Sequence, residues 1–326
     1  MSTVVVVYEL DKRSRDVVAD ALDGAAEPVY LADLDDTARA DALREADAVL
    51  ARTTRELRQG EIALLKDVRL LQFINAGIDF VPLAELPPGV PVATNGGAYA
   101  EPMAEHALAM MLAAAKRLLV EHAALTQGEF NQFAQNRMLA DGVCGILGFG
   151  GIGVAMARLA RGIGMKVHAI NRRGQSDEPI DWIGTPVQLD ELLAASDVLV
   201  ICTPLTPATL GVIGGPQLAR MKDDAILVNL ARGEIVDERA LYERLVAFPK
   251  FTACIDAWWI EPVRHGTFRM DQPFMTLPNV IGSPHNSAAA IAGTGAVGLQ
   301  RAIANIRRAL AGATPFYLVP PEDRMM

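Results

Sequence analysis

Three ionisable side chains, Arg232, Glu261 and His285, each stand shortly after a short apolar run of the chain. In an open parallel sheet, functional residues collect outside the carboxyl ends of the strands. An arginine can bind a carboxylate and polarise the carbonyl beside it, a histidine can donate a proton, and a carboxylate can orient that histidine and stabilise its protonated form. Each residue alone is more often an ordinary surface or core side chain. Their joint placement favours reduction of a carbonyl group by hydride.

A glycine-rich turn precedes these residues in the chain. It has the pattern G-x-G-x-x-G, and it stands between the apolar run Val143–Leu147 and helical residues that lead to a second run. Its first glycine would permit a tight turn, its second a close approach of backbone to a pyrophosphate, and its third close packing of helix on strand. The alternative is an ordinary glycine-rich turn, but the flanking strand–turn–helix–strand pattern favours a dinucleotide on the helix N-terminus. The predicted phosphate-binding residues are Gly148, Gly150, Gly151, Ile152 and Gly153.

The choice between NAD and NADP should be made about 20 residues further on, at the end of the next predicted strand. This position reads Asn171, Arg172, Arg173, and no acidic residue occurs from Met165 to Ser176. A carboxylate there would bind a ribose 2′-hydroxyl and repel a 2′-phosphate, whereas arginine binds phosphate through two parallel hydrogen bonds. The segment therefore favours NADP. The alternative is a solvated loop in an NAD enzyme, with one arginine stacked on adenine.

Short apolar runs alternate with amphipathic Ala/Leu/Arg-rich segments along most of the chain. Such runs, bounded by Gly, Pro or Asp, suit strands buried on both faces of a parallel sheet. Their spacing of about 25 residues leaves room for a crossover helix. The predicted fold class is α/β, with helices on both sides of parallel sheets. The runs are Val4–Tyr8, Val49–Ala51, Leu70–Ile74, Val143–Leu147, Lys166–Ile170, Val198–Cys202, Ile226–Asn229, Thr252–Ile255 and Asn279–Gly282.

Two long helical segments interrupt this alternation and suggest where the chain changes domain. Glu101–Glu121 has strong helix propensity over about 20 residues, with Pro102 near its first turn. Ala288–Leu310 is a second, mostly helical stretch after the last strand. A discontinuous first domain, residues 1–98 and 288–326, would then surround a nucleotide-binding domain, residues 99–287. The length of 326 residues agrees with roughly two domains.

Composition excludes several classes of protein. Apolar residues make up 51% and charged residues 21% of the chain, which argues against disorder, collagen and coiled coil. The net charge of −9 gives no reason to expect a nucleic-acid partner. The longest apolar stretch, Ala107–Ala115, is far too short to span a membrane, and Met1–Leu10 lacks the basic region of a signal peptide. We therefore expect a soluble, cytoplasmic protein.

The three cysteines, Cys144, Cys202 and Cys254, stand singly inside apolar runs. They have no metal-ligand spacing, and their odd number argues against a disulfide framework. We expect buried free thiols, and no metal site.

At these residues the sequence resembles the D-isomer-specific 2-hydroxyacid dehydrogenase family, over most of its length. The family's motifs are represented by the glycine turn and by Asn75–Asp79, Ala104–His106, Cys202–Thr206, Asn229–Gly233, Asp256 with Glu261-Pro262, and Ser283–His285. The resemblance implies a flavodoxin-like substrate domain made from both chain ends and an inserted Rossmann domain.

The resemblance also implies roles for single residues. Arg232 would hold the carboxylate and keto oxygen of the substrate, His285 would be the general acid and base, and Glu261 would pair with His285. Asp256 matches the position that bonds the nicotinamide carboxamide. The remaining implied contacts are Asn75, Ala76 and Gly77 with the substrate carboxylate, and Thr203, Pro204, Leu230 and Ala231 with the cofactor.

Departures from the family pattern concern the substrate and not the reaction type. Asn75 stands where serine is more usual, Phe130 stands near a common tryptophan that can reach a partner subunit, and Asn286–Ala288 lacks the usual apolar-glycine pairing. The leading hypothesis is an NADP-dependent reductase of a small 2-oxo acid such as glyoxylate or hydroxypyruvate. A phosphoglycerate-type dehydrogenase and a dinucleotide-sensing, corepressor-like binding module are the alternatives. Arg52 could contact an anionic substrate tail in the first of these, but a solvated loop charge is the favoured interpretation of this residue.

The sequence also bears on whether the chain associates with a second copy. The mean hydropathy of +0.21 and the Ala/Met/Leu-rich helix Pro102–Leu119 suggest more apolar surface than one chain can bury. The resemblance implies a homodimer through the nucleotide domains. The alternative is that this helix packs inside its own domain.

Overall fold

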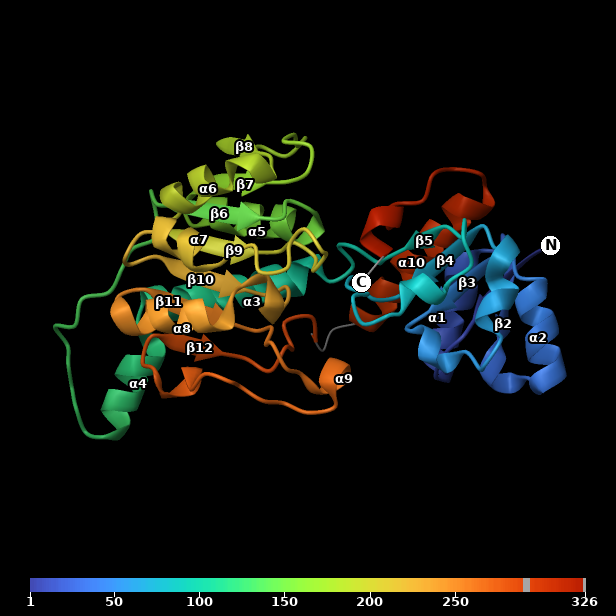
Figure 1. The fold of residues 1–326 in the computed structure, drawn as a ribbon, viewed down its shortest axis with the longest axis horizontal. Coiled ribbons are helices and arrows are strands. Elements are labelled where there is room, and N and C mark those ends of the chain that lie inside the picture. Colours follow the sequence, from blue (N-terminus) through green and yellow to red (C-terminus); the bar gives the residue numbers. More distant parts are fainter. Residues whose placement is uncertain (290–293, 325–326) are drawn as a thin grey trace. The chain divides into compact units, whose positions relative to one another are not determined.

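The computed structural model describes residues 1–289 and 294–324 and divides the chain into two compact units (Figure 1). The first unit is Met1–Tyr99 with Ala290–Met326, and the second is Ala100–Ala289. The expected boundaries at 98/99 and 287/288 lie within two residues of these divisions. Each unit is a parallel sheet with helices packed on it, so the predicted α/β class is confirmed.

The sheet of the first unit has the flavodoxin-like strand order β2-β1-β3-β4-β5. Every neighbouring pair is parallel, so the carboxyl ends of all the strands meet at one edge. The strands are β1 (Ser2–Val6), β2 (Ala26–Tyr30), β3 (Ala48–Ala51), β4 (Leu70–Phe73) and β5 (Val92–Ala93).

Alternate residues of these strands bury opposite faces of the sheet, as the period of two requires. Val4 and Val6 pack with helices α1 (Lys12–Leu22) and α10 (Thr294–Leu310), while Val5 packs into a separate apolar cluster. Helix α2 (Asp36–Arg44) supplies Leu43 to that second cluster. The helix expected from Ala288 begins later than predicted, because residues 288–289 are not helical. Residues 290–293 lie outside the described part of the chain.

The sheet of the second unit has seven parallel strands in the order β12-β11-β10-β9-β6-β7-β8. This is the Rossmann order, in which the chain starts in the middle at β6, moves outward to one edge and then returns to build the other half. The strands are β6 (Val143–Leu147), β7 (Lys166–Ile170), β8 (Trp182–Gly184), β9 (Val198–Ile201), β10 (Ile226–Asn229), β11 (Thr252–Ile255) and β12 (Val280–Gly282).

Helices cover both faces of this sheet (Figure 1). Helix α3 packs against α5 and strands β10 and β11, and its side chains Ala104, Ala107 and Met111 are buried within this unit. The helices are α3 (Ala100–Ala115), α4 (Leu118–Thr126), α5 (Gly151–Gly162), α6 (Leu189–Ala195), α7 (Gly215–Arg220), α8 (Glu238–Ala247) and α9 (Pro262–His265).

The predicted single helix Glu101–Glu121 is wrong, because the chain forms two helices there. Arg117 between them has a left-handed backbone, with φ of 56°. Beside it, Lys116 Nζ donates a hydrogen bond of 2.7 Å to the carbonyl of Arg137, so the end of α3 is attached to the segment that enters β6. Helix α4 points away from the core and buries none of its side chains.

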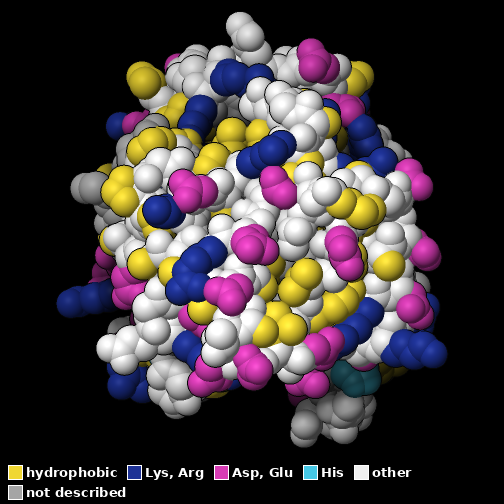
Figure 2. Space-filling view, turned by 90° about the vertical axis from the view of Figure 1, so that its right-hand side faces the viewer, with side chains coloured by type: hydrophobic (Ala, Val, Ile, Leu, Met, Phe, Trp, Pro, Cys, Tyr) yellow, Lys and Arg dark blue, Asp and Glu magenta, His cyan; other side chains and the backbone are white. Residues whose placement is uncertain are grey.

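The surface carries charges of both signs. In the view of Figure 2, acidic and basic side chains are interspersed on one face of the molecule. Within the described residues, no helix combines the length and the apolar character needed to cross a membrane. The three cysteines are free thiols, and burial raises the pKa of Cys144 and Cys254 to about 12.

Candidate active site

The glycine turn joins β6 to α5 and leaves open space for a ligand at Gly150. A Cβ at Gly148, whose φ is +100°, would lie 2.5 Å from the backbone nitrogen of Thr203, and a Cβ at Gly153 would lie 2.5 Å from the carbonyl oxygen of Gly148. By contrast, nothing lies within 4 Å of a Cβ at Gly150, the N-cap of the 12-residue helix α5. Open space before the N-terminal N–H groups of a helix suits an anion, so these residues fit a dinucleotide pyrophosphate.

The segment after β7 has the basic character expected from the sequence, but the side chain of Asn171 bonds within its own turn. Its Oδ1 accepts the N–H of Arg173 at 3.0 Å, and its Nδ2 donates to the carbonyl of Gln175 at 2.8 Å. The amide thus shapes the turn that presents the two arginines, instead of pointing both its polar groups outward. Arg172 and Arg173 are exposed at the carboxyl end of the strand.

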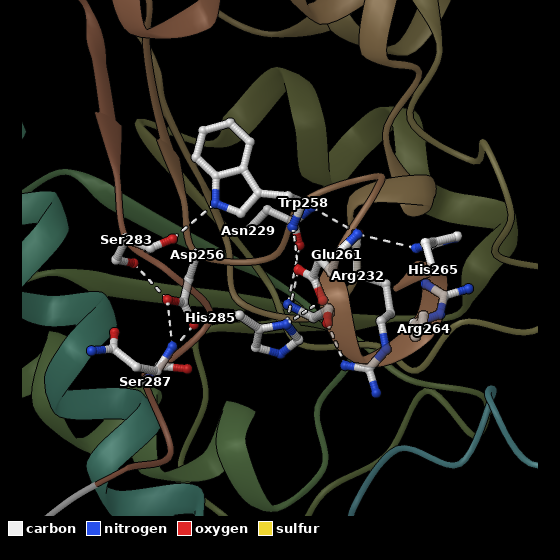
Figure 3. A network of polar contacts seen from close by, with 12 residues as sticks. Asn229, Arg232, Asp256, Trp258, Glu261, Arg264, His265, Ser283, His285 and Ser287 are labelled. Atoms are coloured by element: carbon white, nitrogen blue, oxygen red, sulfur yellow. Dashed lines mark hydrogen bonds and ion pairs between the residues drawn. The ribbon is translucent and has the colours of Figure 1, made fainter. Parts of the chain in front are cut away.

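Glu261 and His285 come together at the carboxyl ends of two adjacent strands, β11 and β12 (Figure 3). Nδ1 of His285 lies 2.7 Å from Oε2 and 2.9 Å from Oε1 of Glu261. Glu261 is 7% exposed, and its Oε1 also accepts the N–H of Trp258 at 2.6 Å. Because Nδ1 is bound to the carboxylate, the other ring nitrogen of His285, Nε2, faces away from Glu261 and can exchange a proton with a ligand.

The charge of Glu261 is kept despite its burial. Desolvation acts to raise the pKa of Glu261, but the hydrogen bond and charge of His285, the N–H of Trp258 and the charge of Arg232 outweigh it, and the net pKa is lowered. A carboxyl group with a lowered pKa is fully ionised at neutral pH. Its stabilising effect on the fold is present above the ordinary glutamate pKa and is lost as pH falls through the lowered value.

Arg232 is brought to this pair by tight packing of two loops. A Cβ at Gly233 would lie 2.4 Å from the backbone carbon of Trp258, so only glycine lets the loop after β10 approach the loop after β11 this closely. Asn229 holds the backbone of Arg232, because its Nδ2 donates to the carbonyl of Arg232 at 2.8 Å. The side chain of Arg232 donates through Nη1 to the carbonyl of Ala231 at 2.7 Å. Leu230 is buried in the core.

Asp256 lies at the end of β11 and is completely buried. Its Oδ1 accepts the hydroxyl of Ser283 at 2.5 Å and the N–H of Asn286 at 3.2 Å, and its Oδ2 accepts the N–H of Ser287 at 3.3 Å. The contact with a nicotinamide carboxamide that the resemblance implies stays a prediction. Ser283 and His106, whose side chains lie 3.0 Å apart, belong to motifs that the sequence analysis quoted without giving either residue a role.

The loop Asn75–Gly77 belongs to the first unit and follows β4. Asn75 donates through Nδ2 to the carbonyl of Arg52 at 2.7 Å and accepts the N–H of Asn95 at 2.9 Å, so its conformation is fixed within that unit. The side chain of Arg52 is 59% exposed and pairs with Glu56 at 3.0 Å. Its charge is partly neutralised by this neighbour.

Two glycines of the turn should separate ligand binding from folding. Gly150→Ala places a methyl group in open space, so it should leave stability unchanged but weaken NADPH binding by roughly tenfold or more, because the pyrophosphate needs that space. Gly153→Ala should instead lower the free energy of unfolding by about 1–3 kcal/mol. Thermal unfolding and a fluorescence titration with NADPH measure the two effects. Equal NADPH affinity in Gly150→Ala and the unmodified protein would contradict the assignment.

Comparison with known proteins agrees with this geometry. Residues 108–287 match the family description "D-isomer specific 2-hydroxyacid dehydrogenase, NAD binding domain". The chain is 30% identical over 259 residues to a hydroxypyruvate reductase of Thermotoga maritima, which covers 78% of this chain and 82% of the relative. It is 32% identical over 245 residues to a D-3-phosphoglycerate dehydrogenase of Archaeoglobus fulgidus, covering 74% of this chain and 45% of that longer relative.

The fold is also that of solved members of the family. A D-isomer specific 2-hydroxyacid dehydrogenase from Xanthobacter autotrophicus Py2, solved in complex with NADPH and MES, superposes with a TM-score of 0.79 at 24% identity, and the match covers 99% of both chains. The chain therefore belongs to the D-isomer specific 2-hydroxyacid dehydrogenase family and is an NAD(P)-dependent oxidoreductase.

Proposed function

We propose that the protein reduces a small 2-oxo acid of the glyoxylate or hydroxypyruvate type to its D-2-hydroxy acid, with NADPH as the favoured cofactor. The observation that carries the proposal is the pair formed by His285 and the buried carboxylate of Glu261 at 2.7 Å, with the charge of Arg232 close enough to lower the pKa of Glu261. A proton donor, a carboxylate that orients it and a guanidinium for the substrate carboxylate are the groups that this reduction needs.

The three side chains divide the work. The guanidinium of Arg232 binds the substrate carboxylate and polarises the neighbouring carbonyl. His285 gives the proton on Nε2 to the carbonyl oxygen, while Glu261 holds the ring through Nδ1 and stabilises its positive charge. A bound nicotinamide cofactor would supply the hydride. In the first unit, we assign the N–H groups of Ala76 and Gly77, with Asn75, to the substrate carboxylate.

Substrate size and cofactor choice rest on separate observations. The hydroxypyruvate reductase relative supports a small 2-oxo acid, and the exposed Arg172 and Arg173 support NADPH. The phosphoglycerate dehydrogenase relative makes oxidation of 3-phosphoglycerate the second candidate. The pairing of Arg52 with Glu56 counts against a phosphate contact at that arginine. Absorbance at 340 nm with NADPH and a panel of 2-oxo acids tests the proposal, and absence of turnover with all of them would favour a dinucleotide-sensing binding module.

Substitutions in the triad of ionisable residues should have different kinetic effects. His285→Ala should lower the rate of reduction by about 10²–10⁴-fold and leave NADPH binding nearly unchanged, because it removes only the proton donor. Arg232→Ala should raise KM as well as lower kcat, since it removes binding of both ground state and transition state. Steady-state kinetics and NADPH titration separate these outcomes. Reduction at the unmodified rate in His285→Ala would show that another group is the acid.

The pH dependence follows from the same pair. Reduction depends on the ionised carboxylate of Glu261, and the pKa of that carboxyl is lowered, so the rate should hold as pH falls to the ordinary glutamate pKa and drop only below it. Glu261→Gln has no group at this position that can take up a proton in that range, so its lower rate should lack this drop at acid pH. Rate profiles of the two proteins against pH measure the difference.

Cofactor preference should depend on the two arginines after β7. Replacing both Arg172 and Arg173 by alanine should weaken NADPH binding by roughly tenfold or more and leave NADH binding almost unchanged, because only NADPH carries the 2′-phosphate. Titration of the double variant with each cofactor gives the comparison. Equal losses with both cofactors would mean that the arginines do not read the phosphate.

We also propose a homodimer, on a different basis from the one that the sequence offered. Helix α3 buries one face in its own unit, but the segment from α4 onward exposes Leu118, Leu119, Leu125, Phe130 and Phe133, the last two to 77% and 84%. Clustered exposed apolar residues mark association surfaces. Light scattering at micromolar concentration should give twice the chain mass of 34.9 kDa, and Phe130→Ser with Phe133→Ser should lower it. A single-chain mass for the unmodified protein would contradict the dimer.

A further inference from the structure

The backbone of His285 has a conformation that needs support. Its φ is +51°, in the left-handed region that residues with a side chain rarely adopt. Such a conformation persists where the surroundings hold it. The ring is held by Glu261. A separate set of contacts, at residues before and after His285, holds the chain itself.

Asp256 supplies the contacts that follow His285. Its two oxygens accept the N–H groups of Asn286 and Ser287, the next two residues of the chain. On the other side, Ser283 donates its N–H to the carbonyl of Ile255 at 2.9 Å, and its own carbonyl accepts Nε1 of Trp258 at 2.8 Å. Figure 3 shows Ser283 and Ser287 on either side of the Asp256 carboxylate.

The proton positions in this network follow from the distances. The hydroxyl of Ser283 donates to Oδ1 of Asp256 at 2.5 Å, so the hydroxyl proton belongs to that bond. Ser283 Oγ must therefore accept from Nε2 of His106, which is 3.0 Å away. This order places a proton on Nε2 of His106, which also lies 3.7 Å from Oδ1 of Asp256.

His106 reaches this network from a distant part of the sequence. It lies on α3, a helix that packs against β11, and its side chain is 27% exposed, whereas the carboxylate of Asp256 has no exposure. A buried polar group needs hydrogen-bond partners. His106 adds to those of Asp256 by way of the hydroxyl of Ser283.

We propose that His106 and Ser283 are positioning residues of the enzyme: they fix the carboxylate of Asp256, which in turn holds the chain on either side of His285 so that its ring meets Glu261. The relay runs from His106 Nε2–H to Ser283 Oγ–H to Asp256, and from Asp256 to the N–H groups of Asn286 and Ser287. The inference rests on the proposed function of His285 as the acid. It assigns Asp256 a task in the chain's own geometry, beside any contact with a cofactor.

A spectroscopic experiment tests the relay without turnover. In protein labelled with ¹³C and ¹⁵N at its five histidines, the ring signals of His285 are identified by their absence in His285→Ala. Ser283→Ala and His106→Leu should each shift or broaden these signals, because the turn loses its support. Ser283→Thr keeps the hydroxyl and His106→Gln keeps an N–H donor, so both should retain the signals of the unmodified protein. His122→Leu, at an exposed histidine of α4, is the matched control and should change only its own signals.

Kinetics give the second readout. Ser283→Ala and His106→Leu should lower kcat for reduction by between about tenfold and a hundredfold, as small misplacements of a catalytic group do, and change the Kd of NADPH by less than about twofold. Unaltered His285 signals in both variants would overturn the proposal, as would NADPH binding that weakens in step with kcat while those signals stay constant. If Ser283→Ala does not fold, the His106→Leu and His106→Gln pair still decides. Absence of turnover in the unmodified protein would count against the proposed function alone, since the signals of His285 are measured without substrate.

Discussion

A buried carboxylate that must keep its charge governs the candidate site. Glu261 loses almost all its contact with water, and a carboxylate in that position would take up a proton unless donors surround it. His285 and the N–H of Trp258 donate hydrogen bonds to this carboxylate. The positive charge of Arg232 adds to their effect on its pKa. The same contacts that keep Glu261 ionised therefore fix the direction of the imidazole. The contacts that keep the charge of Glu261 and those that orient the ring of His285 are thus the same.

Parallel pairing explains why these groups can meet at all. Strands β10, β11 and β12 are neighbours with all their carboxyl ends at one edge, so the residues that follow them project into one region although about 25 residues of chain separate each from the next. The remaining approach depends on Gly233, where any side chain would collide with the backbone of Trp258. The order Arg232-Gly233 thus has a steric reason, because the glycine lets the arginine come close to Glu261.

The strands that the sequence predicted are those formed by an apolar run of four or five residues. Val143–Leu147, Lys166–Ile170, Ile226–Asn229 and Thr252–Ile255 are strands with the predicted bounds. By contrast, β5 and β8 have two and three residues, which is too few to show the alternation of a strand, and no apolar run predicted them. The break at Arg117 was also hidden, since the residues on both sides have strong helix propensity and the left-handed turn depends on tertiary contacts with the segment near Arg137.

The sequence also identified candidate site residues but not the contacts that they make. Residue type and strand position were enough to select Arg232, Glu261 and His285, but not to show that the amide of Asn171 would be used within its own turn. The contact between His106 and Ser283 joins residues 177 positions apart, and neither residue type indicates it without the fold. What the sequence lacks is the set of partners that each polar group finds after folding, because hydrogen-bond satisfaction is a property of the packed structure.

Two buried carboxylates, Glu261 and Asp256, both come from the loop after β11, and they act on the same histidine in different ways. Glu261 contacts the ring, so it affects the direction of the imidazole that we propose as the proton donor. Asp256 contacts the N–H groups that follow in the chain, so it affects the backbone on which the ring is mounted. A left-handed histidine is costly to hold, and one carboxylate could not satisfy both the ring and the backbone. The four residues from Ala257 to Ile260 separate two buried acids, and the tasks that we propose for these acids are complementary.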